Sequence, residues 1–302
     1  MRHPLLQRFP GTEHTEHAFS ALYRDGGLRV GRAPLACWRL SREADILALP
    51  ETLHTLRLEL PGLEVSGLLA YEAGLALHGI RTAKESATQA PLALIQLFAP
   101  ENISDELPLN EASFSLTSAF RPDVAVPDYR QAIARIHAYE KAGTDRAQDQ
   151  ALASDLMASD KDRAENLMIV DLLRNDLGQV CLPGSIQAAP LFELRRFSNV
   201  QHLVSTVTGT LRPDVDPLDA LLAAFPGGSI TGAPKKRAME IIDELEMAPR
   251  GFYCGSQFWI DAQGDLDANI LIRTFQCQDG QIVCHGGGGI VVDSDADTEY
   301  RE

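Results

Sequence analysis

An α+β fold is what this sequence predicts, because helical and strand patterns occupy different stretches of it. Apolar residues recur with helical spacing in the middle of the chain and again from residue 234 to 247. Segments rich in β-branched residues follow residue 200, and turn residues between the last three favour an antiparallel meander. With 302 residues and 45% hydrophobic content, the chain can bury a large core.

Three helices are predicted before residue 180, after an N-terminal part that indicates only short strands and loops. Asp128 is a plausible N-cap for the first helix. The third has the clearest limits, because Ser159 and Asp162 form a variant of the capping box and Gly178 is a typical stop. The expected helices cover about 128–143, 151–158 and 159–178.

Four strands are expected in the last third of the chain, where side chains alternate and β-branched residues are frequent. Gln263-Gly264 and Asp279-Gly280 supply turn residues between the last three strands. The expected strands cover 201–209, 253–260, 269–276 and 281–285.

The segment Phe225–Lys235 combines a glycine turn with a helix start and cations. Pro234 suits the first helical position, and the free N–H groups of that turn favour a carboxylate or phosphate. We therefore expect an anion pocket here, although an ordinary glycine turn that caps a helix explains the same residues. Gly286 to Gly289 form a second stretch where backbone amides can approach a ligand closely.

The bulk properties exclude several classes of protein. A formal net charge of −15 argues against binding nucleic acid or an anionic membrane. Five scattered cysteines without C-x-x-C spacing indicate neither a disulfide framework nor a zinc site. Since no apolar run approaches the roughly 20 residues of a membrane span and the start lacks a secretory signal, a cytoplasmic protein is expected.

Two pairs of acidic residues could bind a metal ion. Asp162 and Glu165 stand three apart on an expected helix, and Glu299 and Glu302 would do the same if the tail is helical. Oxygen ligands of this kind suit Mg²⁺, which would also reconcile an acidic protein with an anionic ligand. A solvated acidic helix face is the commoner explanation of such residues.

Three further side chains could contact a ligand. Arg273 is expected in a strand beside apolar neighbours, partly desolvated, where its planar fork suits a carboxylate. A structural salt bridge explains it equally well. His202 and Tyr253 also fall in expected strands, where structural packing is the simpler explanation of both.

The same residues carry a resemblance to a known family. The chain resembles the chorismate-utilising enzymes, which include anthranilate synthase, aminodeoxychorismate synthase, isochorismate synthase and salicylate synthase. Within the family, the glycine block and Asn-Ile-Leu-Ile-Arg-Thr are most similar to aminodeoxychorismate synthase component I, with anthranilate synthase component I second. The resembling blocks are 159–178, 200–207, 225–246, 253–256, 269–274 and 286–302.

The resemblance implies a fold, a reaction and a partner. The implied fold is one α+β domain over 1–302, with large antiparallel β-sheets flanked by helices, an N-terminal part to 120 and a chorismate-binding core over 121–302. The implied reaction is amination of chorismate to 4-amino-4-deoxychorismate, in the para-aminobenzoate branch of folate biosynthesis. A separate glutamine amidotransferase subunit would supply the ammonia.

The resemblance also implies how the metal binds. Glu165 and Glu302, with Asp162 and Glu299 nearby, would hold Mg²⁺. The ion and the backbone N–H of Gly289 would bind the ring carboxylate of chorismate.

The remaining implied contacts surround the rest of the substrate. Tyr253, Arg273 and the amide of Gly287 would receive the enolpyruvyl carboxylate. His202 would lie near the ring as a catalytic residue, and Thr231 would form part of the wall.

One part of the family pattern is missing. Near residues 141–151 the family carries Gly-Asp-x-Tyr-Gln-x-Asn, Ser-Pro-Glu and Pro-Ile-Lys-Gly-Thr or Pro-Ile-Ala-Gly-Thr blocks, and none is intact here. The expected lysine nucleophile and glutamate acid/base therefore have no counterparts. Either the sequence omits residues that the natural protein has, or the chain is a non-catalytic chorismate-binding or regulatory relative.

Overall fold

The computed structural model describes residues 3–10, 19–24, 27–82, 91–106, 146–196, 201–278 and 281–290. The chain divides into two compact units. Of the described residues, the first unit comprises those up to 106 together with 175–185 and 209–286, and the second comprises 146–174, 186–208 and 287–290. The expected helix over 128–143 lies outside the described residues, and the expectation of a single domain stays a prediction.

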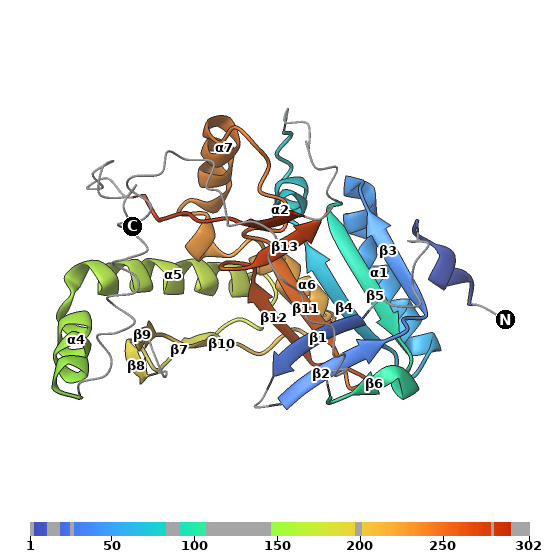
Figure 1. Ribbon diagram of the computed structural model, residues 1–302, viewed down its shortest axis with the longest axis horizontal. Coiled ribbons are helices and arrows are strands. Elements are labelled where there is room, and N and C mark those ends of the chain that lie inside the picture. Colours follow the sequence, from blue (N-terminus) through green and yellow to red (C-terminus); the bar gives the residue numbers. More distant parts are fainter. Residues whose placement is uncertain are drawn as a thin grey trace. The chain divides into compact units, whose positions relative to one another are not determined.

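A five-stranded antiparallel sheet forms the centre of the first unit (Figure 1). Its inner strands alternate strictly, so that Val65 and Leu69 face one side and Glu64 and Ser66 face the other. The strands, in spatial order, are β12 (Leu266–Ile270), β11 (Ser256–Ile260), β4 (Glu64–Leu69), β5 (Ala93–Phe98) and β3 (Ala36–Leu40).

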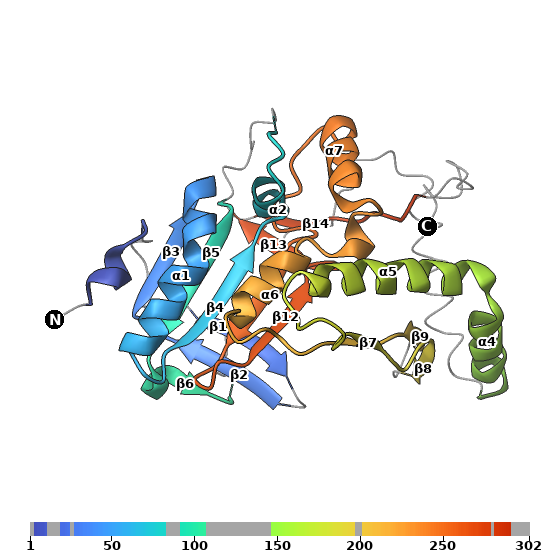
Figure 2. The same ribbon diagram turned by 180° about the vertical axis from the view of Figure 1, so that it is seen from behind.

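Two helices, α1 (Glu43–Glu59) and α6 (Pro217–Ala224), cover one face of this sheet, as Figure 2 shows. Their apolar side chains and those of the strands form the main core, which includes Leu49, Leu53, Leu218, Phe258 and Ile260. Sequence analysis missed α1, because Pro50 lies inside it and proline normally breaks a helix interior.

A smaller antiparallel sheet covers the other face, in the order β1 (Phe19–Arg24), β2 (Gly27–Arg32) and β6 (Ile103–Ser104). Polar contacts join it to the large sheet. Arg29 bonds the buried carboxylate of Glu64, which also accepts a 2.7 Å hydrogen bond from the Trp259 indole. A buried carboxylate with two donors is satisfied, so this polar cluster is compatible with the core around it.

The first unit has further helices, turns and strands besides these two sheets. The helix α2 (Tyr71–Leu77) follows β4 directly. The 3₁₀ turn η3 (Gly228–Ile230) precedes α7 (Lys235–Leu245), and β13 (Phe275–Gln278) pairs with β14 (Gln281–Cys284). Two further 3₁₀ turns are η1 (Pro4–Gln7) and η2 (Pro100–Asn102).

The second unit contains α4 (Arg146–Ala158), most of α5 (Asp160–Gly178) and two small antiparallel sheets. One sheet pairs β8 (Glu193–Arg196) with β9 (Gln201–Val204). The other pairs β7 (Gln187–Ala188) with β10 (Val207–Thr208). The helix α4 packs against β9.

Most expected elements are confirmed. The helix predicted from Ser159 to Gly178 is α5, and Ser159 Oγ accepts from the backbone N–H of Asp162 at 3.2 Å, as the capping pattern predicts. The helix expected to start at residue 151 begins at Arg146, because Arg, Ala and Gln in that stretch are good helix formers. The α+β prediction with antiparallel sheets flanked by helices is confirmed.

The strand predictions need three corrections. The strand expected over 201–209 is interrupted at Ser205, and the strand expected over 253–260 starts only at Ser256. The strand expected over 269–276 is two strands of different sheets, so the last three strands are not one meander. Among the described residues, no helix is long and apolar enough to cross a bilayer.

Candidate functional site

The glycine turn before α7 is closed by its own hydrogen bonds. Thr231 Oγ1 donates to the carbonyl of Gly227 at 3.0 Å, and the N–H of Ile230 donates to the same carbonyl at 3.2 Å. Gly227 lies against β12, because a Cβ there would come within 2.7 Å of Cδ1 of Ile270 and would force that side chain to shift. The turn is therefore wedged against the large sheet.

The start of α7 lacks a capping side chain. Pro234 is the N-cap residue rather than the first helical residue, and in the described structure the N-cap makes no side-chain hydrogen bond to the helix. Such a helix end carries partial positive charge and favours anions. The anion pocket expected in this segment stays a prediction.

The lysine of the same segment does not serve that pocket. Lys235 Nζ lies 2.7 Å from Asp176 Oδ2 and donates to the carbonyl of Ala224 at 3.0 Å. The two side chains are only 9% and 4% exposed. Burial raises the pKa of Asp176, and the charge and hydrogen bond of Lys235 oppose that shift. Lys235 is thus a structural anchor of α7, since its ammonium group is bonded to Asp176 and to the Ala224 carbonyl.

A residue that sequence analysis missed, Arg250, joins the turn to Tyr253. Its Nη1 donates to the carbonyl of Ile230 at 3.0 Å, and its guanidinium lies 6.0 Å from the Tyr253 ring centroid. It also bonds both carboxylate oxygens of Glu246 at 2.7–3.2 Å. The signal was available, since an arginine flanked by Pro249 and Gly251 stands three residues before Tyr253.

Tyr253 lies in a turn before β11, not in a strand. Its N–H donates to the carbonyl of Arg250 at 3.2 Å, and its ring stacks on His285 at a centroid distance of 5.2 Å. Burial raises the pKa of its hydroxyl. Because Gly286 follows His285, the first unit places Tyr253 beside the beginning of the glycine run.

Arg273 lies between two strands and is exposed, contrary to the expectation that it would be partly desolvated in a strand. Residues 271–274 separate β12 from β13, and Arg273 has φ of 51° in the left-handed region. Leu271 leaves the strand because its N–H and C=O bond Gly255 and Cys254 instead of a neighbouring strand. Arg273 is exposed rather than partly desolvated, so its guanidinium is accessible to solvent.

In the second unit, a polar contact fixes α5 against the β9 region. Asn166 donates to the carbonyl of Leu203 at 3.0 Å and accepts from Ser205 Oγ at 2.5 Å. Ser205 Oγ also accepts from the N–H of Phe192 at 3.0 Å. These bonds interrupt the expected strand, and sequence analysis missed Asn166.

The predicted site residues of this unit lie next to that contact. Glu165 precedes Asn166 on α5, and His202 precedes Leu203 on β9. Asp162, one turn before Asn166, is half-buried, whereas Glu165 and His202 are exposed. Asn166 and Ser205 therefore hold together α5, the end of β9 and the backbone at Phe192. The first two of these segments carry expected site residues.

The expected metal site is only partly covered. Asp162 and Glu165 lie three apart on α5, whereas Glu299 and Glu302 lie outside the described residues. Within the described ranges, no group of three or more His, Cys, Asp or Glu side chains could hold a metal ion. Two carboxylates on one helix fit the oxygen ligands of Mg²⁺ but do not complete a site, so the four-carboxylate site stays a prediction.

Gly287 and Gly289 are exposed. A Cβ at Gly286 or Gly289 would meet nothing within 4 Å, so no protein atom in the described structure requires glycine at these two positions. Their roles as amide donors to a carboxylate stay predictions.

Comparison with known proteins gives a match over the second half of the chain. A family model described as chorismate binding enzyme matches residues 140–302. Aminodeoxychorismate synthase component 1 of Salmonella typhimurium is 54% identical over 158 residues, which are 52% of this chain and 34% of the relative. Anthranilate synthase component 1 of Geobacillus stearothermophilus is 44% identical over 179 residues, 59% of this chain and 35% of the relative.

Solved structures resemble the whole fold. Anthranilate synthase component I of Streptococcus pneumoniae superposes with a TM-score of 0.65 at 22% identity, over 98% of this chain and 92% of that chain. By sequence, the chain spans about a third of the length of the curated relatives it matches.

Proposed function

The chain belongs to the family of chorismate binding enzymes, and from that premise we propose that it aminates chorismate to 4-amino-4-deoxychorismate. A C–N bond would form on the ring with ammonia, and the C–O bond of the ring hydroxyl would break with release of water. A glutamine amidotransferase subunit would deliver the ammonia, and the para-aminobenzoate branch of folate biosynthesis would use the product in the cytoplasm.

The observation that carries the para assignment is sequence identity. Relatives named aminodeoxychorismate synthase component 1 from Salmonella typhimurium and Escherichia coli are 54% and 53% identical, against 44% for the anthranilate synthase of Geobacillus stearothermophilus. These relatives bear names with "component 1", which supports a partner subunit. Anthranilate synthase activity is the alternative within the family.

We assign the enolpyruvyl carboxylate to the first unit. Arg273 is exposed and positively charged, Tyr253 lies beside His285, and the uncapped start of α7 adds positive potential near Thr231. The family resemblance adds the amide of Gly287, a residue of the second unit, as a further donor to this carboxylate. A guanidinium can bind a carboxylate through two parallel hydrogen bonds, which suits an acidic protein that must hold an anion.

We assign the ring carboxylate to a Mg²⁺ ion held by Glu165 and Glu302, with Asp162 and Glu299 nearby and the Gly289 amide as a further donor. When bound, this ion supplies Lewis-acid stabilisation of negative charge. The chain's own contribution is to hold Glu165 and His202 in place through the contacts of Asn166. His202 is then the catalytic residue nearest the ring.

The proposal has an alternative of another class. Because the family's Lys and Glu blocks near 141–151 are not intact, the chain could bind chorismate as a regulatory relative without turning it over. Binding and turnover therefore need separate measurements.

Chorismate, ammonium and Mg²⁺ should be incubated with the 302-residue chain, and the product identified by chromatography and mass spectrometry. Calorimetric titration with chorismate in the presence of Mg²⁺ measures binding independently. Formation of 4-amino-4-deoxychorismate supports the proposal, and formation of anthranilate supports the alternative within the family. Binding without product supports the non-catalytic relative, whereas absence of binding rejects all three.

The site assignment is tested by Arg273→Gln, which should weaken chorismate binding about tenfold or more. Arg237→Gln is the matched control, since Arg237 is an exposed arginine of α7 that pairs with Glu240. Equal effects of the two substitutions would remove Arg273 from the receptor.

A further inference from the structure

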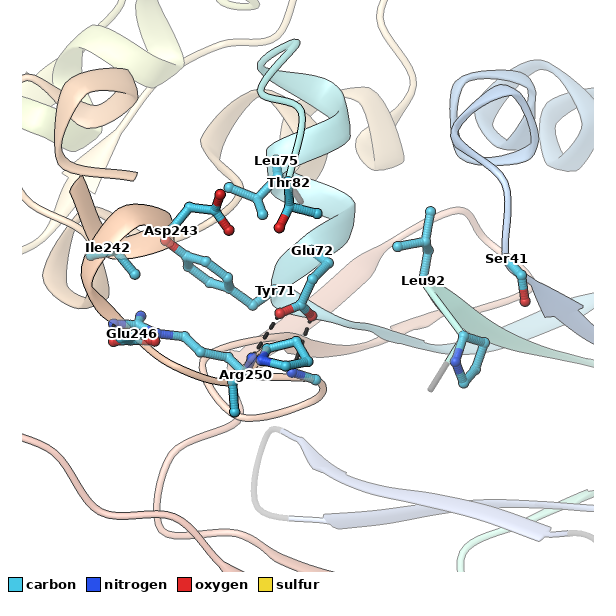
Figure 3. Close-up of a pocket in the computed structure, with 14 residues that line it drawn as sticks. Ser41, Tyr71, Glu72, Leu75, Thr82, Leu92, Ile242, Asp243, Glu246 and Arg250 are labelled. Carbon is cyan, nitrogen blue, oxygen red and sulfur yellow. Dashed lines mark hydrogen bonds and ion pairs between the residues drawn. The ribbon is translucent and has the colours of Figure 1, made fainter. Parts of the chain in front are cut away.

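A pocket of about 210 Å³ lies in the first unit between α2, the last turns of α7 and the loop after α7. It shares no residue with the proposed chorismate contacts. Figure 3 shows Tyr71 and Glu72 of α2, Asp243 of α7, Glu246 at its C-cap, and Arg250 around it.

Tyr71 carries a hydroxyl without a partner. The residue is 2% exposed, and its oxygen forms no hydrogen bond with any described group. Figure 3 shows the ring pointing toward Ile242 and Asp243 of α7, inside the pocket. Buried hydroxyls are nearly always hydrogen-bonded, so this one indicates a missing polar group.

The charges around the pocket favour a cation. Glu72, Asp243 and Glu246 contribute three carboxylates and Arg250 one guanidinium, a formal sum of −2. Arg250 is already bonded to Glu246 and to the carbonyl of Ile230, so it offers little to an anion.

Glu72 carries a buried negative charge that a bound cation would stabilise. Its two oxygens accept from the N–H groups of Arg250 and Gly251 at 2.7 and 3.0 Å. Burial nevertheless raises the pKa of Glu72, so its negative charge is incompletely compensated. A carboxylate oxygen has room for a second donor beside each backbone N–H.

A metal ion is the less suitable cation. Within the described residues, no three His, Cys, Asp or Glu side chains converge as metal ligands. The pocket walls also include Leu75, Leu92 and Ile242, which would contact carbon atoms rather than hydrated metal.

We propose that this pocket binds a small organic cation, a primary ammonium group on a compact apolar body. The ammonium hydrogens bond the Glu72 carboxylate and the Tyr71 oxygen, while the body lies against Leu75, Leu92 and Ile242. An ammonium group has three donors, which matches a pocket with several acceptors.

Occupancy of the pocket would act on the rest of the first unit through Arg250. Its guanidinium lies 4.6 Å from the Tyr71 ring centroid and also contacts Tyr253 and the Ile230 carbonyl. A ligand beside Tyr71 therefore alters the surroundings of the glycine turn. Neither the pocket nor this link depends on the proposed function.

Phenethylamine is the test ligand, with 2-phenylethanol and phenylacetate as neutral and anionic controls. Two-dimensional NMR of the labelled full chain should show the amine binding about tenfold more tightly than the alcohol, and phenylacetate more weakly than either. The amide signals of Ile230, Thr231 and Tyr253 should shift with the amine. Equal binding of the three compounds, or no binding at about 10 mM, would overturn the proposal.

Two variants locate the cation. Glu72→Gln should weaken phenethylamine binding about tenfold and Tyr71→Phe severalfold, without affecting 2-phenylethanol. Glu240→Gln is the matched control on α7, since Glu240 does not line the pocket. If Glu72→Gln fails to fold, Tyr71→Phe decides alone, because its ring packing is kept. Wild-type amine affinity in Tyr71→Phe, or an equal loss in Glu240→Gln, would contradict the assignment.

Discussion

The two ends of α7 are fastened by different kinds of charge pair. At the first residue, Lys235 contacts Asp176 and the backbone carbonyl of Ala224, and both charged side chains are almost fully buried. Beyond the last residue, Arg250 contacts Glu246, which is 40% exposed, and adds a backbone carbonyl and two aromatic rings. The first ion pair is buried on both sides, whereas the second is partly exposed and its arginine contacts several other groups.

The two ion pairs therefore have different roles: the first fixes the position of α7, and the second links the end of α7 to the glycine turn. Removing one member of a deep pair leaves the other charge buried and uncompensated, so the helix position depends on it. Removing Arg250 would change several weaker contacts at once, among them the Ile230 carbonyl beside Thr231. Stability should therefore depend most on Lys235, and the geometry of the glycine turn most on Arg250.

Lys235→Met is expected to have the largest effect, a loss of about 3–5 kcal/mol in the free energy of unfolding. Asp176 would remain buried without its cation, while the methionine keeps most of the aliphatic volume. Urea unfolding followed by circular dichroism measures the loss.

The neighbouring Lys236→Met is the control, because Lys236 is exposed and should change stability by less than about 0.5 kcal/mol. The double variant Lys235→Met with Asp176→Leu should recover much of the loss. A loss below about 1 kcal/mol in Lys235→Met would show that the pair is not an anchor.

Arg250→Lys is expected to cost about 2 kcal/mol, less than the lysine substitution. Lysine keeps the charge but loses the planar fork and the stacking on Tyr71. Solvent screens the exposed Glu246, so the cost comes mainly from the Ile230 carbonyl and the rings. If the proposed function is correct, chorismate affinity should fall severalfold as well.

Arg237→Lys is the matched control on the same helix, because its pair with Glu240 is exposed and should be nearly neutral. Chorismate affinity unchanged in a destabilised Arg250→Lys variant would mean that Arg250 supports the fold only. Equal stability losses in the two variants would contradict the comparison itself.

Much of the fold follows from the sequence, because periodicity reports which face is buried. The capping pattern at Ser159 and Gly178 predicted α5 correctly, and the apolar spacing from Ala238 to Leu245 predicted α7. The helix α1 was missed because proline disfavours the interior of a helix. Burial of Leu49 and Leu53 in the core nevertheless stabilises a helix around Pro50.

The site was harder to predict, because hydrogen bonds between distant segments carry no periodic signal. Ser205 interrupts a strand to bond Asn166, 39 residues away, and Arg250 crosses to Ile230, 20 residues away. The ion pair of Lys235 with Asp176 likewise joins residues 59 apart in the sequence, and both side chains are almost fully buried. The sequence motifs thus predicted which segments carry candidate site residues, but not which groups those side chains contact.

Glu72→Gln should give the smallest effect, one that changes with pH. Burial raises the folded-state pKa of Glu72, so between about pH 4.5 and that raised value the folded chain binds more protons than the unfolded chain. The wild type therefore loses stability relative to Glu72→Gln as the pH rises through this window. Tyr71, Asp243 and Glu246 face the same pocket, and the Arg250 charge opposes the shift.

Urea unfolding of the wild type and of Glu72→Gln from about pH 4 to pH 7 measures the difference in their free energies of unfolding. Groups that titrate equally in both proteins do not contribute to this difference. The stability deficit of Glu72→Gln should be greatest at the acidic end and shrink toward neutrality. Glu240→Gln should show no such trend, since Glu240 is only half-buried and does not line the pocket. A deficit that grows with pH would mean that Arg250 and the backbone N–H groups outweigh burial, and that the pocket lacks uncompensated negative charge.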